Sequence, residues 1–237
     1  MATKGKLIVI DGIDGSGKAT QVALLKQRLT KEKIKVKTID FPRYQDNFFG
    51  ALIGKYLSGI YGDFIAMDPR VASVLYAADR FESSAQIRAW LDAGYTVIAD
   101  RYVSANQIHQ GGKIANPKER KEFLEYLDEM EHGAFKTPRP DLVIYLDVPF
   151  EVSRAWLQKK VAQRKKTYLK GGRKDVAEDN LLHLKHSRES ALSLQKTHKN
   201  WEKVQCCDGM VCMLPEQVHE QVYTIVSKHL RLKKKKA

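Results

Sequence analysis

A glycine-rich segment near the N-terminus limits what this chain can fold into more than any other feature. Residues 7–10 are apolar and mostly β-branched, residues 12–18 read Gly-Ile-Asp-Gly-Ser-Gly-Lys, and an amphipathic helical pattern begins near Lys18. A strand, the spacing Gly-x-x-x-x-Gly-Lys and a helix, in that order, are typical of a phosphate-binding loop, whose backbone N–H groups and lysine surround an anion. The segment therefore predicts an α/β domain that binds a nucleoside triphosphate.

The residue after the lysine departs from the usual pattern of such a loop. Ser or Thr is expected there because its hydroxyl binds Mg²⁺, but this chain has Ala19 and carries a hydroxyl one residue later, on Thr20. Adjacent residues of a helix point in different directions, so Thr20 does not automatically replace the missing group. We expect phosphate binding to be retained and Mg²⁺ to be held by another residue and by water.

The composition fits one cytoplasmic domain of ordinary size. The chain has 237 residues, of which 43% are hydrophobic and 29% are charged, which is enough for one sizeable core. It contains no run of about 18 apolar residues, and its first residues lead directly into a strand, so we expect neither a transmembrane helix nor a signal peptide. Cys206, Cys207 and Cys212 have no histidine pair at zinc spacing beside them. We therefore expect reduced thiols rather than a metal site.

Basic residues concentrate in two places and contribute to a formal charge of +13. Residues 163–179 contain almost no apolar side chains and predict a mobile basic lid, with Arg164 and Arg173 inside it, although a solvated loop is the alternative. Residues 231–237 predict a disordered tail, which leaves one domain over residues 1–230. A basic chain suits polyanionic partners, both nucleotides and nucleic acids, and the charge does not choose between them.

An acidic and a basic side chain follow the apolar strand predicted for residues 96–100. Asp100 ends this strand and Arg101 comes directly after it. Ligands of open α/β sheets bind at the carboxyl ends of the strands. A carboxylate there suits the Mg²⁺ of a bound nucleotide, and a guanidinium can bind a phosphate with two hydrogen bonds. A structural ion pair of Asp100 is the alternative interpretation.

Two further segments carry side chains that suit a nucleotide. Arg43 and Tyr44 lie on a loop after the strand predicted for residues 35–41, where Arg43 is either a ligand or a solvated charge. Tyr76 and Arg80 are four residues apart on a predicted helix and share a face. They form either a core aromatic residue beside a surface ion pair or a plate for a base with a guanidinium at its edge. Residues 102–112 are rich in amide and hydroxyl groups that can contact the edge of a base.

In their order along the chain, these segments resemble the thymidylate kinases. The resemblance rests on the phosphate loop with Asp14, on Phe41-Pro-Arg-Tyr44, on Tyr76 with Arg80, on Asp100-Arg-Tyr102 and on the basic lid. It extends from about Lys6 to the last helix. It implies an α/β fold of the three-layer P-loop NTPase type, with a mostly parallel central sheet flanked by helices. It also implies a homodimer that moves the γ-phosphoryl group of ATP to dTMP with the help of Mg²⁺.

The resemblance assigns a role to individual residues. ATP would be bound by the loop residues Gly12, Ile13, Asp14, Gly15, Ser16, Gly17, Lys18, Ala19 and Thr20. The acceptor would be bound by Arg43, Tyr44, Tyr76, Arg80, Arg101, Asn106, Gln107 and His109, and Mg²⁺ by Asp100. The catalytic set would be Lys18, Asp14, Arg101, Arg173 and Arg164.

Within the acceptor set, the resemblance distinguishes contacts to phosphate, base and sugar. Arg43 and Arg101 would clamp the monophosphate, and Asp14 would approach the sugar hydroxyl. Tyr76 would stack on thymine while Arg80 contacts its O4. Asn106 and the adjacent glutamine would face the edge of the base.

Two positions differ from the family pattern. Some members have an arginine inside the phosphate loop, where this chain has Gly15 and Ser16. The arginine that stabilises the transition state is therefore expected from the lid, with Arg173 as the first choice and Arg164 as the second. His109 stands near the sugar 2′ position, where many relatives have an aromatic residue, which leaves the discrimination of deoxyribose from ribose open.

Two other functions compete with a thymidylate kinase. One is a kinase for another nucleoside monophosphate or for a deoxynucleoside, but the paired Arg43 and Arg101 favour an acceptor that already carries a phosphate. The other is a non-catalytic P-loop protein that binds nucleic acid, to which the charge and Ala19 point. No recognisable nucleic-acid-binding motif is present. We therefore expect small-molecule substrates and neither a specific nucleic acid nor a membrane as a partner.

Overall fold

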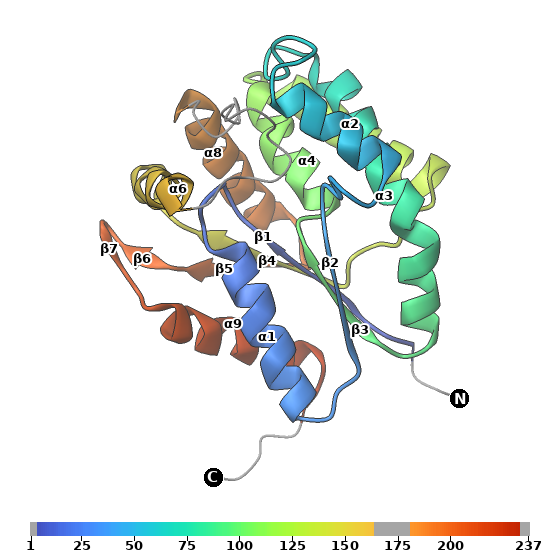
Figure 1. Ribbon diagram of the computed structural model, residues 1–237, viewed down its shortest axis with the longest axis vertical. Coiled ribbons are helices and arrows are strands. Elements are labelled where there is room, and N and C mark those ends of the chain that lie inside the picture. Colours follow the sequence, from blue (N-terminus) through green and yellow to red (C-terminus); the bar gives the residue numbers. More distant parts are fainter. Residues whose placement is uncertain (1–3, 164–180, 233–237) are drawn as a thin grey trace.

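Five strands form a parallel sheet at the centre of the protein, whose computed structural model describes residues 4–163 and 181–232 (Figure 1). The strands are β1 (Leu7–Asp11), β2 (Val36–Asp40), β3 (Thr96–Asp100), β4 (Leu142–Asp147) and β5 (Trp201–Gln205). Their order across the sheet is β2-β3-β1-β4-β5, and each of these pairings is parallel. The predicted α/β class with a mostly parallel sheet is confirmed.

β1 lies in the middle of this sheet, between β3 and β4, and its side chains are apolar on both faces. Leu7 and Val9 pack into the core on one face, and Ile8 and Ile10 pack into the core on the other. A strand covered on both sides has to be apolar nearly throughout, which explains the continuous run seen in the sequence. The phosphate loop is thereby anchored at the centre of the sheet.

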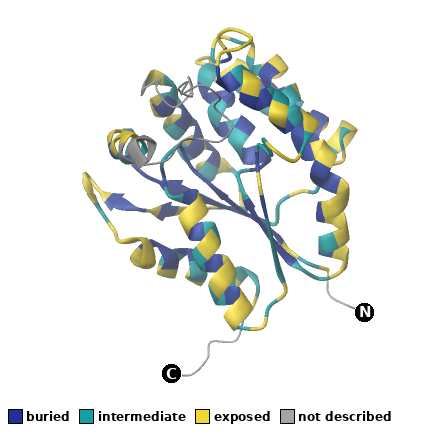
Figure 2. Ribbon diagram, viewed as in Figure 1, coloured by how far each residue is buried: buried dark blue, intermediate teal, exposed yellow. Residues whose placement is uncertain are grey.

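Helices cover both faces of the sheet and give three layers (Figure 1). They are α1 (Lys18–Lys31), α2 (Phe48–Leu57), α3 (Pro69–Asp92), α4 (Val103–His109), α5 (Pro117–Asp128), α6 (Phe150–Gln163), α8 (Leu181–Thr197) and α9 (Pro215–His229). α3, α4 and α8 pack on one face through residues such as Ile87, Val103 and Leu194. α1 and α9 pack on the other through Leu25 and Val222. Figure 2 shows the buried sheet between helices whose outer surfaces are exposed.

The long helix α3 begins and ends at local sequence signals. Asp68 is its N-cap, whose carboxylate accepts hydrogen bonds from two N–H groups of the first turn, and Pro69 occupies the first helical position. Gly94, with a φ of 78°, follows its C-terminal end. The 24 residues of α3 carry Tyr76 and Arg80 on the same helix.

The bonding state of the cysteines differs from the sequence prediction. The last strand of the sheet ends at Gln205, two residues earlier than expected, and a short antiparallel ribbon follows, with β6 (Cys207–Asp208) beside β7 (Val211–Cys212). Cys207 and Cys212 are joined by a disulfide, while Cys206 is a buried free thiol. The prediction of three reduced thiols was therefore wrong for two of them. The turn at Gly209, with a φ of 55°, brings position 207 opposite position 212, and the sequence spacing alone did not reveal that turn.

Most of the predicted lid and of the basic tail lies outside the described residues, which leave out residues 164–180 and 233–237. Arg164 and Arg173 fall in the first of these ranges, so the role predicted for them stays a prediction. In the described part of the chain, no helix combines the length and apolar character needed to cross a membrane.

Candidate active site

The phosphate loop connects β1 to α1, and two of its glycines are required by their surroundings. A Cβ at position 12 would lie 2.4 Å from the Oγ of Ser16 and 3.0 Å from the backbone carbonyl oxygen of Leu146. Gly15 has a φ of 80°, and a Cβ there would lie 2.5 Å from the carbonyl oxygen of Ser153 on α6. The close approach of α6 thus explains why position 15 has no side chain in this protein.

The loop presents unpaired donors where an anion would bind. Gly17 is the N-cap of α1 and provides no side-chain cap, so the first N–H groups of the helix are open. The hydroxyl of Ser16 is buried and has no hydrogen-bond partner among the described residues. These groups suit the phosphates of a nucleotide.

Lys18 is the first residue of α1, and its ammonium group folds back over the loop. Its Nζ donates hydrogen bonds to the carbonyl oxygens of Gly12 and Ile13, both at 2.9 Å. Burial lowers the pKa of Lys18 and the charge of Arg101 lowers it further, while Asp14 and other carboxylates oppose this effect. An anion bound in the loop would supply a negative charge beside the ammonium group of Lys18 and would oppose this lowering of its pKa. The other two loop positions at the helix start, Ala19 and Thr20, are exposed.

A cavity of about 200 Å³ opens beside the phosphate loop. It is lined by Gly15, Ser16, Gly17, Thr20, Gln21, Trp156, Cys206, Met213, Pro215 and Val218. Most of its wall outside the loop is apolar, and Gln21 and Ser16 contribute polar atoms at its edge. Sequence reasoning did not identify this cavity, because its wall is assembled from α1, α6, the start of α9 and the segment before it.

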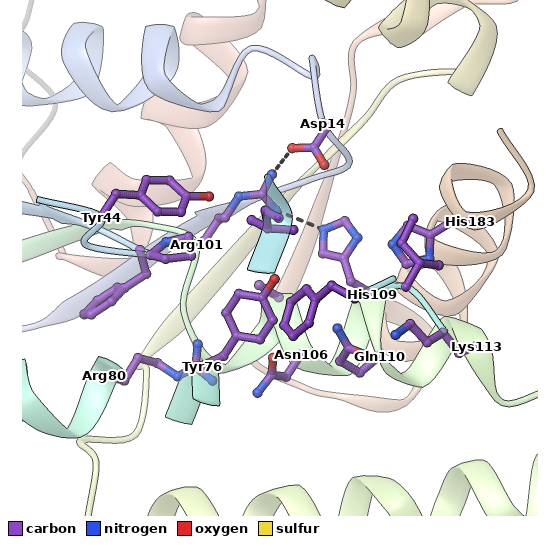
Figure 3. A pocket seen from close by; sticks show the side chains of 16 residues that line it. Asp14, Tyr44, Tyr76, Arg80, Arg101, Asn106, His109, Gln110, Lys113 and His183 are labelled. Carbon is purple, nitrogen blue, oxygen red and sulfur yellow. Dashed lines mark hydrogen bonds and ion pairs between the residues drawn. The ribbon is translucent and has the colours of Figure 1, made fainter. Parts of the chain in front are cut away.

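A pocket of about 100 Å³ with both polar and apolar walls lies beyond the ends of β2 and β3 (Figure 3). It is lined by Asp14, Phe41, Pro42, Tyr44, Leu57, Phe64, Ile65, Tyr76, Arg80, Arg101, Ala105, Asn106, His109, Gln110, Lys113 and His183. Six of the eight predicted acceptor residues line this pocket, namely Tyr44, Tyr76, Arg80, Arg101, Asn106 and His109. Arg43 and Gln107 do not. The structure therefore brings together most of the residues that the sequence grouped.

Arg101 joins this pocket to the phosphate loop. Its Nη2 forms an ion pair with Asp14 of the loop, and its Nη1 lies 2.9 Å from Nε2 of His109 (Figure 3). The backbone of Arg101 has a φ of 65°, a conformation that costs about 1–3 kcal/mol. Its N–H donates to the carbonyl oxygen of Ile10 at 3.1 Å, which holds the turn against β1. Burial lowers the pKa of Arg101, but Asp14 and neighbouring carboxylates raise it more, so the guanidinium stays charged.

His109 is a neutral acceptor in this arrangement. Arginine has no acceptor atom, so Nε2 of His109 has to accept the hydrogen bond from Arg101. Nδ1 then carries the proton and donates it to Oγ of Ser187 on α8, at 3.2 Å. Burial, with the adjacent charge of Arg101, lowers the pKa of His109 well below its usual value.

The aromatic side of the pocket is built around Tyr76. Its ring centroid lies 5.8 Å from that of Phe64, which in turn lies 5.2 Å from the ring of Tyr56. Arg80, one turn further along α3, is only 1% exposed and forms a buried ion pair with Glu131. The alternative of an ordinary surface ion pair at Arg80 is thus wrong, because this pair is inside the protein and beside the pocket.

Two predicted acceptor residues, Arg43 and Gln107, do not line the pocket. Gln107 instead lines a groove between α5 and α8, and its carbonyl oxygen accepts a hydrogen bond from Ser190. Residues 106, 109 and 110 of one helical face line the pocket, and position 107 belongs to another face. Arg43 pairs with Asp46 at 2.9 Å, although the residues on both sides of it line the pocket.

Sequence reasoning missed the pocket residues Lys113 and His183, and it counted Gln110 only among the amide groups of residues 102–112, not in the acceptor set. Gln110 lies four residues after Asn106, a spacing that places both residues on the same side of the helix. Its Oε1 is buried and has no hydrogen-bond partner in the described part of the chain. Burial lowers the pKa of Lys113 to about 8 and that of His183 to about 4. No local signal identifies His183, because only the packing of α8 brings it to the pocket.

Asp100, the residue predicted to bind Mg²⁺, ends β3 directly before Arg101, and its role as a metal ligand stays a prediction. Burial raises the pKa of Asp100, while Lys18 and Arg101 oppose the increase. No group of three or more His, Cys, Asp or Glu side chains that could hold a metal ion occurs in the described ranges.

Comparison with known proteins identifies relatives of this chain. The family model described as thymidylate kinase matches residues 10–207. A protein of Pyrobaculum aerophilum named probable thymidylate kinase is 31% identical over 163 residues, which are 68% of this chain and 74% of that protein. The thymidylate kinase of Thermosipho africanus is 27% identical over 226 residues, with 94% of this chain and 98% of that protein covered.

A solved structure has the same fold. Thymidylate kinase from Candida albicans superposes with a TM-score of 0.70 and covers 97% of this chain and 94% of its own. The sequence identity is 24%, so this similarity concerns the fold alone.

Proposed function

The chain belongs to the thymidylate kinase family, and we propose that it transfers the γ-phosphoryl group of ATP to dTMP, which yields ADP and dTDP. The observation that carries this proposal is the position of Arg101, which contacts Asp14 of the phosphate loop and also lines the acceptor pocket. A group there can neutralise charge on both nucleotides. Phosphoryl transfer depends on such positioning and charge stabilisation more than on covalent help from the protein.

The donor nucleotide would occupy the phosphate loop and the cavity beside it. The N–H groups of residues 12–17 and the open N-terminus of α1 would bind the phosphates. Lys18 would exchange its hydrogen bonds with the carbonyl oxygens of Gly12 and Ile13 for contacts to the β- and γ-phosphates. The apolar wall around Trp156 and Pro215 would take the base of ATP.

The acceptor would lie between the aromatic side of the pocket and Arg101. The ring of Tyr76 would stack on thymine, and Arg80 would donate to its O4. Asn106 would lie at the edge of the base and His109 near the sugar. The pair between Arg101 and Asp14 is partly exposed, with side-chain exposures of 17% and 22%. The acceptor phosphate would displace Asp14 from Arg101, and Asp14 would then approach the sugar hydroxyl.

The remaining charge stabilisation would come from Mg²⁺ and from the predicted lid. Asp100 would hold Mg²⁺, which neutralises charge on the transferring phosphates when it is bound. Arg173 or Arg164 would supply the guanidinium that the phosphate loop lacks, because α6 leaves no space for a side chain at position 15.

Exposed apolar side chains on α3 support the proposal that the protein forms a homodimer. Val71, Val74 and Phe81 lie on one face of this helix and are 55%, 39% and 52% exposed. Phe48, at the start of α2, is 71% exposed. Exposed apolar stripes of this kind mark interfaces between protein chains. Sedimentation of the wild type and of Phe81→Glu tests the assembly, and a wild-type monomer would contradict it.

The reaction is tested by coupling ADP release to a spectrophotometric assay with ATP and Mg²⁺. The acceptors to compare are dTMP, dUMP, UMP, AMP and thymidine. We expect a strong preference for dTMP. Turnover with another monophosphate would retain the kinase and reject the assignment of the base contacts, and no turnover with any acceptor would reject the kinase itself.

A further inference from the structure

Glu131 is fully buried and does not line the acceptor pocket, but it contacts Arg80, which does. It belongs to the π-helical segment η2 (Glu129–Ala134), 51 residues from Arg80 along the chain. The two oxygens of its carboxylate lie 3.0 and 3.2 Å from Nε of Arg80, and one of them also binds Nη2. Side-chain exposures are 2% for Arg80 and 0% for Glu131. The two residues therefore form a bidentate ion pair sealed inside the protein.

This pair determines which donors of Arg80 remain available. A guanidinium has five N–H groups. Glu131 takes the N–H of Nε and one of Nη2, and the carbonyl oxygen of Tyr102 takes one of Nη1 at 3.2 Å. Among the described residues, one N–H on each terminal nitrogen is left without an acceptor, and Arg80 lines the pocket beside Tyr76 (Figure 3). Such N–H donors suit a carbonyl oxygen.

The backbone around Glu131 is built to hold its carboxylate in place. α5 ends at Asp128 and continues as a π-helical turn. Such a turn contains an extra residue, and one residue corresponds to a rotation of about 100° around a helix. Thr137 then fixes Glu131 from the other side, because its Oγ1 donates to the carbonyl oxygen at 2.5 Å and lies 3.3 Å from the carboxylate.

The Arg80 pair differs in exposure from the other ion pair of the pocket. Asp14 and Arg101 are partly exposed, so an incoming phosphate can replace the carboxylate of Asp14. Glu131 has no exposed surface, and a buried arginine that lost it would be left as an uncompensated charge. Arg80 consequently offers hydrogen-bond donors with its charge already balanced, which favours a neutral carbonyl group over an anion.

Resting on the proposed function, we propose that Glu131 is a specificity-determining positioning residue for the acceptor base. It orients Arg80 and balances its charge. The guanidinium then donates to a base carbonyl and does not compete with Arg101 for the phosphate of the acceptor.

The test compares acceptor selectivity in Glu131→Gln and in the conservative variant Glu131→Asp, with Glu129→Gln as the control. Glu129 belongs to the same segment but is exposed. Steady-state constants are measured for ATP, dTMP and dCMP, because dCMP carries an amino group where dTMP has its O4 carbonyl. We expect Glu131→Gln to lower kcat/KM for dTMP about tenfold or more, mainly through KM, and to reduce the preference for dTMP over dCMP by a similar factor. KM for ATP should not change, and Glu131→Asp should recover part of the preference.

Because Glu131→Gln leaves a buried charge, a second comparison does not depend on its folding. Arg80→Met is compared with the double variant Arg80→Met/Glu131→Gln, in which both members of the pair are neutral. If Glu131 acts through Arg80, the double variant has the same kcat/KM for dTMP as Arg80→Met. A further tenfold loss in the double variant would overturn the inference.

Measurements on the wild type distinguish a failure of this inference from a failure of the proposed function. If the wild type phosphorylates dTMP and folded Glu131→Gln keeps the same preference over dCMP, only the role of Glu131 is refuted. If the wild type does not phosphorylate dTMP, the proposed function is refuted and the inference with it.

Discussion

Asp79 gives this protein a pH-dependent stability that one substitution should remove. Its carboxylate is fully buried and accepts hydrogen bonds from the N–H of Arg43 at 3.1 Å and from Nδ2 of Asn47 at 3.1 Å. It thereby holds the loop that carries Arg43 and Tyr44 against α3. Burial raises the pKa of Asp79 from 3.8 to about 6, although the hydrogen bond from Arg43 acts in the opposite direction.

The size and sign of the effect follow from this shift. A difference of about two pKa units corresponds to about 3 kcal/mol, since each unit is about 1.4 kcal/mol. The folded protein binds the proton more tightly than the unfolded chain, so the stabilisation is fully present below the unfolded pKa of 3.8 and is lost as the pH rises through about 6. About 2 kcal/mol of this change falls between pH 4.5 and pH 7.

The substitution Asp79→Asn removes the ionisation and preserves the size of the side chain. We expect the free energy of unfolding of the variant, minus that of the wild type, to increase by about 2 kcal/mol from pH 4.5 to pH 7. Urea unfolding followed by circular dichroism at several pH values measures this difference. Asp92→Asn, an exposed carboxylate on the same helix, is the control for the loss of one acid. Parallel pH profiles of the wild type and Asp79→Asn would refute the reasoning.

The remaining predictions concern the two nucleotide sites. Lys18→Ala should lower kcat at least about 100-fold and leave the far-ultraviolet circular dichroism unchanged, because the lysine neutralises phosphate charge in the transition state; near-normal turnover would remove Lys18 from the site. Arg101→Ala should lower kcat/KM for dTMP about 100-fold and change KM for ATP little, as measured by steady-state kinetics with each substrate varied in turn; equal effects on both substrates would contradict its assignment to the acceptor. Gly15→Ala should destabilise the protein by about 1–3 kcal/mol in urea unfolding and weaken ATP binding, since a Cβ would lie 2.5 Å from the carbonyl oxygen of Ser153 at a φ of 80°. A fully stable Gly15→Ala protein would show that α6 can move away from the loop.

Local patterns in the sequence predicted much of the fold. The apolar runs that became β1, β3 and β4 are continuous because both faces of these strands are covered. The glycines before Lys18 and the proline at the start of α3 mark the ends of elements through their own backbone preferences. Such signals act over a few residues, so they can be read without knowing what packs against them.

The candidate site was predicted in part, for a related reason. Tyr76, Arg101 and Asn106 lie near strand ends or on one face of a helix, and these placements follow from spacing and from the topology of parallel sheets. Gln107 was grouped with them because it is adjacent in sequence. The rotation of about 100° per residue in a helix carries it to another groove.

By itself, the sequence determined the phosphate-loop motif and the α/β class, and it predicted the residue types that would contact a nucleotide, because each of these depends on local geometry and on a strand order common to parallel sheets. Only the tertiary structure decided the partners of those residues. The pairing of Arg80 with Glu131, the disulfide between Cys207 and Cys212 and the arrival of His183 at the pocket depend on which distant elements pack together. Which elements pack together depends on burying the apolar surface of the whole chain, so it cannot be inferred from any short segment.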